Sequence, residues 1–169
     1  KAKKSSGEGS SSAPNKSVQY ETNGAPKQGT VNFGYPNTFK SHYTVGKELG
    51  KGQFGVVHQC QRKQDGEEAK VLAVKMIDKS KFDSRQAVED VRREVLIMKQ
   101  LRNMENVVEI QDAFEDKKYV YIVMELCEGG ELFDRIIKKG KYTEKDAAVL
   151  VRQMLKVIAE CHLQGIIHR

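Results

Sequence analysis

Short apolar runs rich in β-branched residues alternate with polar turns through the middle of the chain. Runs of this length, bounded by Gly, Asp and Asn, are typical of strands rather than helices. Five of them are predicted to be strands: residues 43–49, 55–61, 71–77, 107–114 and 119–124. The turn sequence Gln64-Asp65-Gly66 separates the second run from the third, so the first three should form an antiparallel meander.

Three further stretches carry the apolar spacing or the end residues of helices. The clearest covers residues 84–101, where Ser84 is a suitable N-cap and apolar residues recur every three or four positions. A short helix is predicted at 131–139, and a longer one begins after Thr143 and is stopped by Gly165. Strands followed by helices, with no internal repeat, predict an α+β fold.

Residues 1–40 have a different composition from the rest. They are mostly Ser, Gly, Asn, Pro and Lys, with few large apolar side chains. Such a segment cannot bury enough apolar surface to offset the entropy lost on ordering, so we expect a disordered tail. Its aromatic residues Phe33, Tyr35 and Phe39 are candidates for contact with the domain.

Charge and chain ends restrict the possible partners. The formal net charge is +6, and several of the lysines lie near the start of the chain. Solvated lysines on a tail are a more ordinary interpretation than a nucleic-acid or membrane patch, so no nucleic-acid partner is expected. No apolar run approaches the roughly 18 residues of a membrane span. The 169 residues lack an initial Met and stop within a segment at His168-Arg169, so we expect a fragment.

The chain has an odd number of cysteines, namely Cys60, Cys127 and Cys161, and no C-x-x-C pair. This pattern argues against a disulfide framework or a zinc site and fits a reducing compartment. We therefore expect a cytoplasmic protein, with membrane association of a longer parent left open.

Three glycines stand at the spacing G-x-G-x-x-G: Gly50, Gly52 and Gly55. Without a Cβ, such a loop lets backbone N–H groups come close to a phosphate. A dinucleotide-binding fold needs a helix after the loop and an acidic residue about 20 positions later, but a strand follows and Lys75 stands there. A Walker loop would end in Gly-Lys-Ser/Thr. A hairpin turn over a nucleotide is the remaining interpretation, with a Rossmann-type oxidoreductase as a distant alternative.

Lys75 is the one charge inside an apolar strand, and small Ala73 precedes it, as though a flat group packs there. The ordinary alternative is an edge lysine that reaches water. Glu94 projects within the apolar stripe of the helix at 84–101. Its neighbours three and four positions away are not basic: Asp90, Val91, Ile97 and Met98. Because a buried carboxylate needs a partner, we predict a Lys75–Glu94 pair.

A strand that ends near Cys127 leads into a linker at residues 128–132. Backbone N–H and C=O groups of a linker can recognise a planar base such as adenine. Glu131 opens a predicted helix, and two interpretations stay open for it. Its charge can complement the helix N-terminus, or it can contact ribose hydroxyls.

Together these residues resemble a eukaryotic protein kinase from about residue 43 to residue 169. The matching motifs are G-x-G-x-x-G-x-V at Gly50, Gly52, Gly55 and Val57, the V-A-I-K strand at Leu72, Ala73, Val74 and Lys75, the helix αC glutamate at Glu94, the gatekeeper at Met124, and the first two residues of H-R-D at His168 and Arg169. The sequence of residues 124–136 is similar to that of the calcium/calmodulin-type group, and most similar to that of calcium-dependent protein kinases of plants and protists.

The resemblance implies a small lobe at 41–125, a hinge at 126–130 and the start of a truncated helical large lobe at 131–169. The small lobe would be a five-stranded antiparallel sheet plus helix αC. ATP and Mg²⁺ are the implied cofactors, with Lys75, held by Glu94, on the α- and β-phosphates. The implied catalytic residues are Lys75, Glu94, His168 and Arg169. The implied nucleotide contacts are Leu49, Gly50, Lys51, Gly52, Gln53, Phe54, Gly55, Val56, Val57, Ala73, Lys75, Met124, Glu125, Cys127 and Glu131.

Several parts of the family pattern fall beyond Arg169: the catalytic aspartate, the magnesium ligands, D-F-G, the activation loop and any EF-hands. The resemblance implies a Ser/Thr kinase for protein substrates with a basic residue nearby, regulated by calcium through a missing domain. Residues 103–106 replace the usual His-Pro-Asn turn. The alternative is a pseudokinase or nucleotide-binding scaffold, although Lys75, Glu94 and the three glycines argue against it.

We expect residues 1–169 alone to transfer no phosphate, because the implied catalytic aspartate lies outside them. We also expect aggregation, since the apolar face of the helix after Thr143 would lack its cover. The measurement is radiolabel transfer from ATP to a basic Ser/Thr peptide by the purified chain. Robust magnesium-dependent phosphorylation would refute this expectation.

Overall fold

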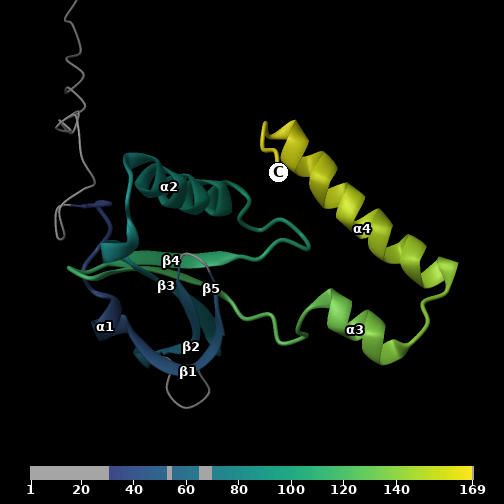
Figure 1. Cartoon of the computed structure of the whole chain (residues 1–169), viewed down its shortest axis with the longest axis horizontal. Helices are drawn as coiled ribbons and strands as arrows, with labels where there is room; N and C mark the ends of the chain where they lie inside the picture. The colour runs from purple at the N-terminus through teal and green to yellow at the C-terminus, as the bar shows by residue number, and fades with distance from the viewer. Residues whose placement is uncertain (1–30, 53–54, 65–69, 169) are drawn as a thin grey trace, which may run out of the picture.

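The computed structural model describes residues 31–52, 55–64 and 70–168, which form one sheet and several helices (Figure 1). The strands are β1 Tyr43–Lys51, β2 Val56–Arg62, β3 Leu72–Asp78, β4 Ile110–Glu115 and β5 Tyr119–Glu125. The helices are α1 Phe39–His42, α2 Arg85–Gln100, α3 Leu132–Lys139 and α4 Glu144–Leu163, with the 3₁₀ turn η2 Lys79–Lys81 after β3. Most of the predicted turn at 64–66 and the first 30 residues of the predicted tail lie outside the described residues.

All five predicted strands are present in one antiparallel sheet of order β1-β2-β3-β5-β4. The predicted α+β class and the meander of the first three strands are therefore confirmed. Strand β4 begins at Ile110 rather than at the predicted residue 107, because the chain is still turning before it. Asn103 and Asn106 adopt left-handed φ angles of 65° and 62°, which asparagine tolerates better than most residues.

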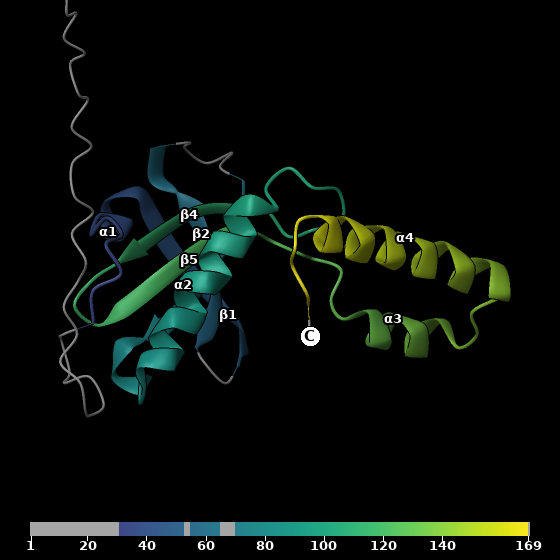
Figure 2. The same cartoon turned by 90° about the horizontal axis from the view of Figure 1, so that it is seen from above.

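The sheet buries side chains on both faces, because successive residues of a strand point to opposite sides. In both views α2 lies along one face (Figure 1 and Figure 2). The cluster on that side includes Ile77, Val88, Val91, Val95, Ile110, Val120 and Ile122. The cluster on the opposite side includes Phe39, Tyr43, Cys60, Leu72, Val74, Phe114, Tyr121 and Val123.

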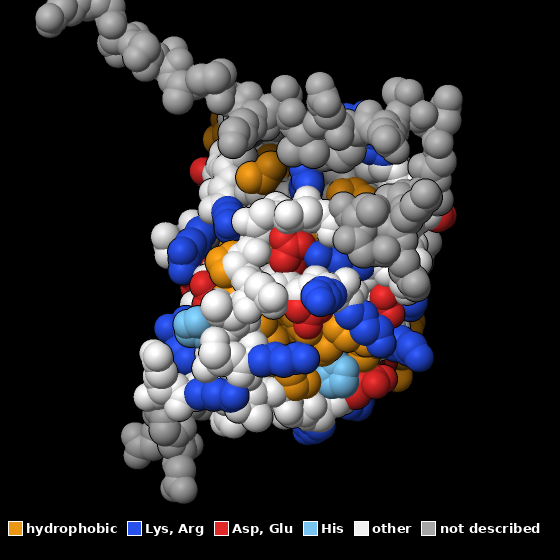
Figure 3. Space-filling view, turned by 90° about the vertical axis from the view of Figure 1, so that its left-hand side faces the viewer, with side chains coloured by type: hydrophobic (Ala, Val, Ile, Leu, Met, Phe, Trp, Pro, Cys, Tyr) orange, Lys and Arg blue, Asp and Glu red, His pale blue; other side chains and the backbone are white. Residues whose placement is uncertain are grey.

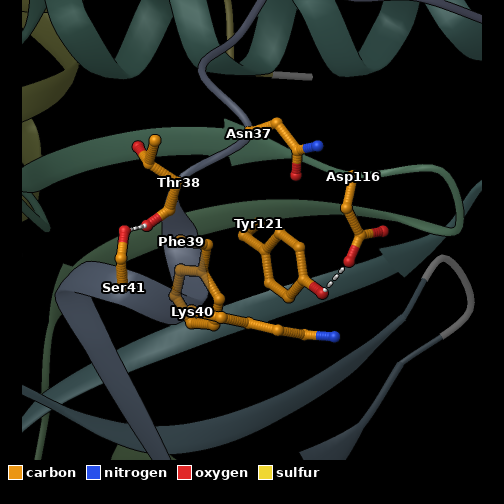
Figure 4. Close-up of a pocket in the computed structure, with 7 residues that line it drawn as sticks. All are labelled: Asn37, Thr38, Phe39, Lys40, Ser41, Asp116 and Tyr121. Atoms are coloured by element: carbon orange, nitrogen blue, oxygen red, sulfur yellow. Dashed lines mark hydrogen bonds between the residues drawn. The ribbon is translucent and has the colours of Figure 1, made fainter.

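The prediction of a disordered tail through residue 40 is wrong for residues 31–40, which pack against the sheet. Phe39 in α1 is only 3% exposed, and its ring stacks on Tyr121 with 4.1 Å between centroids. Figure 4 shows the two rings side by side, with the Tyr121 hydroxyl donating a hydrogen bond to Asp116 at 2.7 Å. Phe33 is buried in the other cluster. The expected contact of Phe33, Tyr35 and Phe39 with the domain is confirmed, and each aromatic side chain can bury a large apolar area.

The helix limits follow the predicted end residues. Ser84 caps α2 by accepting a hydrogen bond from the Ala87 N–H at 3.2 Å, and Thr143 caps α4 through the Asp146 N–H at 3.1 Å. After α4, Gly165 takes a φ of 74°, a left-handed conformation that glycine adopts without strain. Capping chemistry therefore sets the ends of these helices.

Helices α3 and α4 lie to one side of the sheet (Figure 1 and Figure 2). Large apolar side chains on α4 are exposed, among them Val149, Val151, Met154, Leu155, Ile158 and Leu163. Val151, Met154, Leu155 and Ile158 project from one side of α4, so that side presents an exposed apolar surface.

The surface of the described residues carries both signs of charge. On the face in Figure 3, Lys and Arg side chains are dispersed, with acidic side chains among them. The positive charge is therefore not gathered into one block on the visible part of that face. None of the described helices combines the length and the apolar character needed to cross a membrane.

Replacing Phe39 by alanine should lower the free energy of unfolding by about 3–5 kcal/mol, because it leaves a ring-sized hole among buried aromatic residues. Urea unfolding followed by tyrosine fluorescence measures the change. Phe133→Ala is the matched control, since that ring is 67% exposed. Equal effects of the two substitutions would contradict the structural role assigned to Phe39.

Candidate active site

The centre of the candidate site is an ion pair between the sheet and α2. Lys75 lies on β3, paired with Val57 of β2 and Ile122 of β5. Its Nζ is 2.6 Å from Oε1 of Glu94 on α2, which confirms the predicted pair. The side chains are 21% and 37% exposed, so the pair is sheltered but open to one side.

The helix surface around Glu94 explains why its carboxylate reaches the sheet. Val91 and Val95 are buried beside it on α2, one turn before it and at the next position. The charged residue Arg93, by contrast, pairs with Asp90 on the exposed side at 3.4 Å. The apolar stripe that packs α2 on the sheet therefore also carries Glu94 toward Lys75.

The glycine loop joins β1 to β2. Gly50 and Lys51 pair with Val57 and Val56, and the Gly52 N–H donates to the Gly55 carbonyl at 2.9 Å. Two further predicted contacts, Gln53 and Phe54, lie outside the described residues.

The three glycines of the motif differ in what the fold requires of them. A Cβ on Gly55 would lie 2.3 Å from the Met76 carbonyl oxygen, so close backbone packing requires glycine there. A Cβ on Gly50 would meet nothing within 4 Å, and one on Gly52 would meet only the Gly55 carbonyl at 3.8 Å. Neither takes a left-handed φ. Packing within the described chain thus explains Gly55 and leaves Gly50 and Gly52 as an open, side-chain-free surface.

The strand register brings other predicted contacts onto the same face as Lys75. Cross-strand partners share a face, and Val57 is paired with Lys75 while Ala73 is paired with Met124. That face is the one covered by α2. Leu49 lies in an irregularity of β1 between Glu48 and Gly50 and is exposed. An apolar surface therefore lies next to the Lys75 amine.

The predicted hinge begins where β5 ends. The Glu125 N–H donates to the Glu109 carbonyl at 2.9 Å, and the Glu125 carboxylate accepts from the Glu109 N–H at 3.2 Å. Cys127 is exposed, and its thiol is free. Glu131 precedes α3, but its carboxylate makes no capping hydrogen bond to the helix. Its side chain is consequently not committed to the helix start.

The remaining predicted positions are less informative. His168 is exposed, and Arg169 lies outside the described residues. Within the described ranges, no cluster of His, Cys, Asp and Glu could hold a metal ion. Burial raises the pKa of the Cys60 thiol to about 12, so it stays protonated in the core.

Sequence reasoning missed a second lysine–carboxylate pair, Lys79 with Glu115, which is more buried than the first. Both residues stand at strand ends in polar surroundings, where a charge is ordinary. The sequence contains one indirect indication of this pair. Phe33 and Tyr35 flank Gly34 in a tail otherwise poor in large apolar residues, and they suggest that this part of the tail packs on the domain.

Comparison with known proteins relates this geometry to one family. Residues 43–169 match the model of the protein kinase domain. The chain is 51% identical over 148 residues to calcium-dependent protein kinase 34 of Arabidopsis thaliana, covering 86% of this chain and 28% of the relative. It is 55% identical over 130 residues to calcium-dependent protein kinase 2 of Oryza sativa subsp. japonica, covering 77% and 25%. The chain thus spans about a quarter of the length of these relatives.

The glycine geometry predicts different costs for two alanine substitutions. Gly55→Ala should destabilise the fold by about 1–3 kcal/mol, because the new methyl group forces the β2 and β3 backbones apart. Gly50→Ala, the matched control, should be neutral or slightly stabilising, since its Cβ meets open space. Urea unfolding of both variants measures the difference, and equal destabilisation would contradict it.

Proposed function

The chain belongs to the protein kinase family, and we propose that the full-length protein transfers the γ-phosphoryl group of ATP to serine or threonine residues of proteins. The observation that carries this proposal is the Lys75–Glu94 ion pair on the face of the sheet next to the glycine loop. Loss of either charge would remove the means of holding a phosphate there.

The residues around the Lys75–Glu94 pair fit a nucleoside triphosphate. Gly50 and Gly52 themselves carry no side chain, which would let their backbone N–H groups approach phosphate oxygens. Glu94 holds the Lys75 ammonium group in place, and the Lys75 Nζ has further protons to donate to the α- and β-phosphates. Bound ATP would supply the transferred group, and Mg²⁺ held by residues outside this chain would offset its charge. Preorganised positive charge is the main contribution of these residues.

The base would lie against the apolar part of the same face, between Leu49, Val57 and Ala73. Its polar edge would meet the hinge backbone after Met124. The Glu125 N–H already donates a hydrogen bond to the Glu109 carbonyl. The Glu125 carbonyl is therefore the backbone group that Glu125 can offer to the base. We assign the complementary donor to the Cys127 N–H, and the ribose hydroxyls to Glu131, whose carboxylate does not cap α3.

Regulation and substrate choice are further parts of the proposal. The relatives are named calcium-dependent protein kinases, which supports calcium control of the full-length protein through a part outside this chain. Glu131 would also attract a basic residue near the target serine or threonine. The free cysteines of the described residues fit a cytoplasmic location.

Lys75→Met in the full-length protein tests the proposal. We expect kcat for peptide phosphorylation to fall on the order of 10²–10³-fold, because phosphate charge in the transition state loses its partner. Glu94→Gln should also lower kcat, because it removes the negative charge while keeping the shape of the side chain. Lys70→Met, at an exposed lysine just before β3, is the matched control and should leave kcat unchanged.

The same experiment separates an enzyme from a nucleotide-binding scaffold. A wild-type protein that binds ATP but transfers no phosphate, with Lys75→Met reducing only binding, would support the scaffold. Transfer that survives Lys75→Met at the wild-type rate would overturn the role given to the ion pair.

A further inference from the structure

Residues 31–36 form a segment that lies before the family match at residue 43, and its backbone is hydrogen-bonded to Glu115 of the sheet and to Arg92 of α2. The Glu115 carboxylate accepts hydrogen bonds from the N–H groups of Phe33 at 3.1 Å and Tyr35 at 3.0 Å. The Glu115 N–H donates to the Pro36 carbonyl at 3.1 Å. We call residues 31–36 the aromatic brace; in Figure 1 they are the purple trace that leads into α1.

The anchor of the aromatic brace is a buried charge pair. The side chains of Lys79 and Glu115 are 7% and 9% exposed and form an ion pair. Burial alone raises the pKa of Glu115, but Lys79 and the N–H groups of Phe33 and Tyr35 hold that pKa below its ordinary value. Lys79 also donates to the Val31 carbonyl at 3.2 Å. A buried pair is tolerated only when its remaining polar atoms are satisfied, and the aromatic brace satisfies them.

The side chains of the aromatic brace fill space beneath α2. Phe33 is 9% exposed and belongs to the buried cluster that holds α2 on the sheet. Its ring lies 5.7 Å from the ring of Phe82, which is in the loop that leads into α2. The Arg92 guanidinium lies 5.4 Å from the Phe33 ring and donates to the Asn32 carbonyl at 2.5 Å.

These contacts bracket Glu94 along the helix. Arg92 lies two residues before Glu94, and Lys99 lies five residues after it, with its Nζ 5.9 Å from the Tyr35 ring. Val91, on the same side of α2 as Glu94, is in the cluster with Phe33. A rotation or shift of α2 would therefore disturb both the Phe33 packing and the Lys75–Glu94 pair.

We propose that Phe33 is a positioning residue for phosphoryl transfer: through the aromatic brace it fixes α2 so that Glu94 stays on Lys75. This inference rests on the proposed function, because it gives the ion pair a catalytic use. It goes further in assigning a role to a segment outside the matched kinase domain. An N-terminal segment of the same chain thereby becomes part of the active-site support.

A double-mutant cycle in the full-length protein tests the proposal. Phe33→Ala is made with Glu94 intact and with Glu94→Gln, and kcat/KM for ATP is measured at saturating peptide. We expect a loss of about tenfold when Glu94 is intact and less than about twofold in the Glu94→Gln protein, because the supported pair is then already lost. Phe33→Leu leaves a smaller hole, so we expect a loss of about two- to threefold when Glu94 is intact and no further loss in the Glu94→Gln protein. This variant serves if Phe33→Ala does not fold.

Phe39→Ala is the matched control, since it removes a buried ring from the cluster on the opposite face of the sheet. It should reduce kcat/KM by the same factor in both Glu94 backgrounds. If Phe33→Ala, or Phe33→Leu in its place, also acts equally in both, the positioning role is overturned.

Hydrogen exchange of the same full-length variants separates the two proposals, because it needs no turnover. Amides of α2 should exchange faster in Phe33→Ala than in Phe39→Ala. A wild-type protein without phosphoryl transfer would defeat the proposed function, while the exchange comparison would still decide the aromatic brace. Unchanged α2 exchange in both Phe33 variants would defeat the brace by itself.

Discussion

A lysine taken out of water must find an opposite charge, and this constraint organises the small lobe around β3. Lys75 on the strand meets Glu94 of α2, and Lys79 just after the strand meets Glu115 at the end of β4. The first pair joins the helix to the sheet, and the second joins the N-terminal segment to the same sheet. Two charges four residues apart thus bring three separate parts of the chain to one strand. The positions of the candidate phosphate site and of its support both depend on them.

The site combines residues that the fold needs with residues that it does not. Gly55 is required by the approach of the Met76 carbonyl, so its presence says little about a ligand. A Cβ would meet open space at Gly50 and only an ordinary contact with the Gly55 carbonyl at Gly52, so packing among the described residues does not require glycine at either. A motif that looks uniform in sequence therefore has one member that packing requires and two that packing among the described residues does not require. This division is compatible with the phosphate contact proposed for Gly50 and Gly52, which rests chiefly on the Lys75–Glu94 pair.

Sequence reasoning succeeded where a residue was out of place in its local pattern. Lys75 interrupts an apolar strand and Glu94 interrupts an apolar stripe, so each could be recognised as inward-facing and the two could be paired. At residues 31–40 it identified the aromatic side chains as candidates for contact, but it wrongly predicted disorder from the polar composition around them. Phe33 and Phe39 each belong to an apolar cluster, on opposite faces of the sheet. Whether an isolated aromatic residue is buried depends on an apolar surface formed by residues far away in the sequence. The residues next to it in the sequence do not indicate that surface.

Local periodicity and capping residues suffice to place the strands, the limits of the long helices and the inward side of α2, because these features depend on neighbours within a few positions. The Lys79–Glu115 pair and its link to the aromatic brace are different. Glu115 binds the Phe33 backbone across 82 positions of sequence. Those charges become buried only once β4, α2 and the N-terminal segment have packed together. Tertiary packing alone therefore turns two ordinary surface-type residues into an anchor, since desolvation is a property of the assembled core.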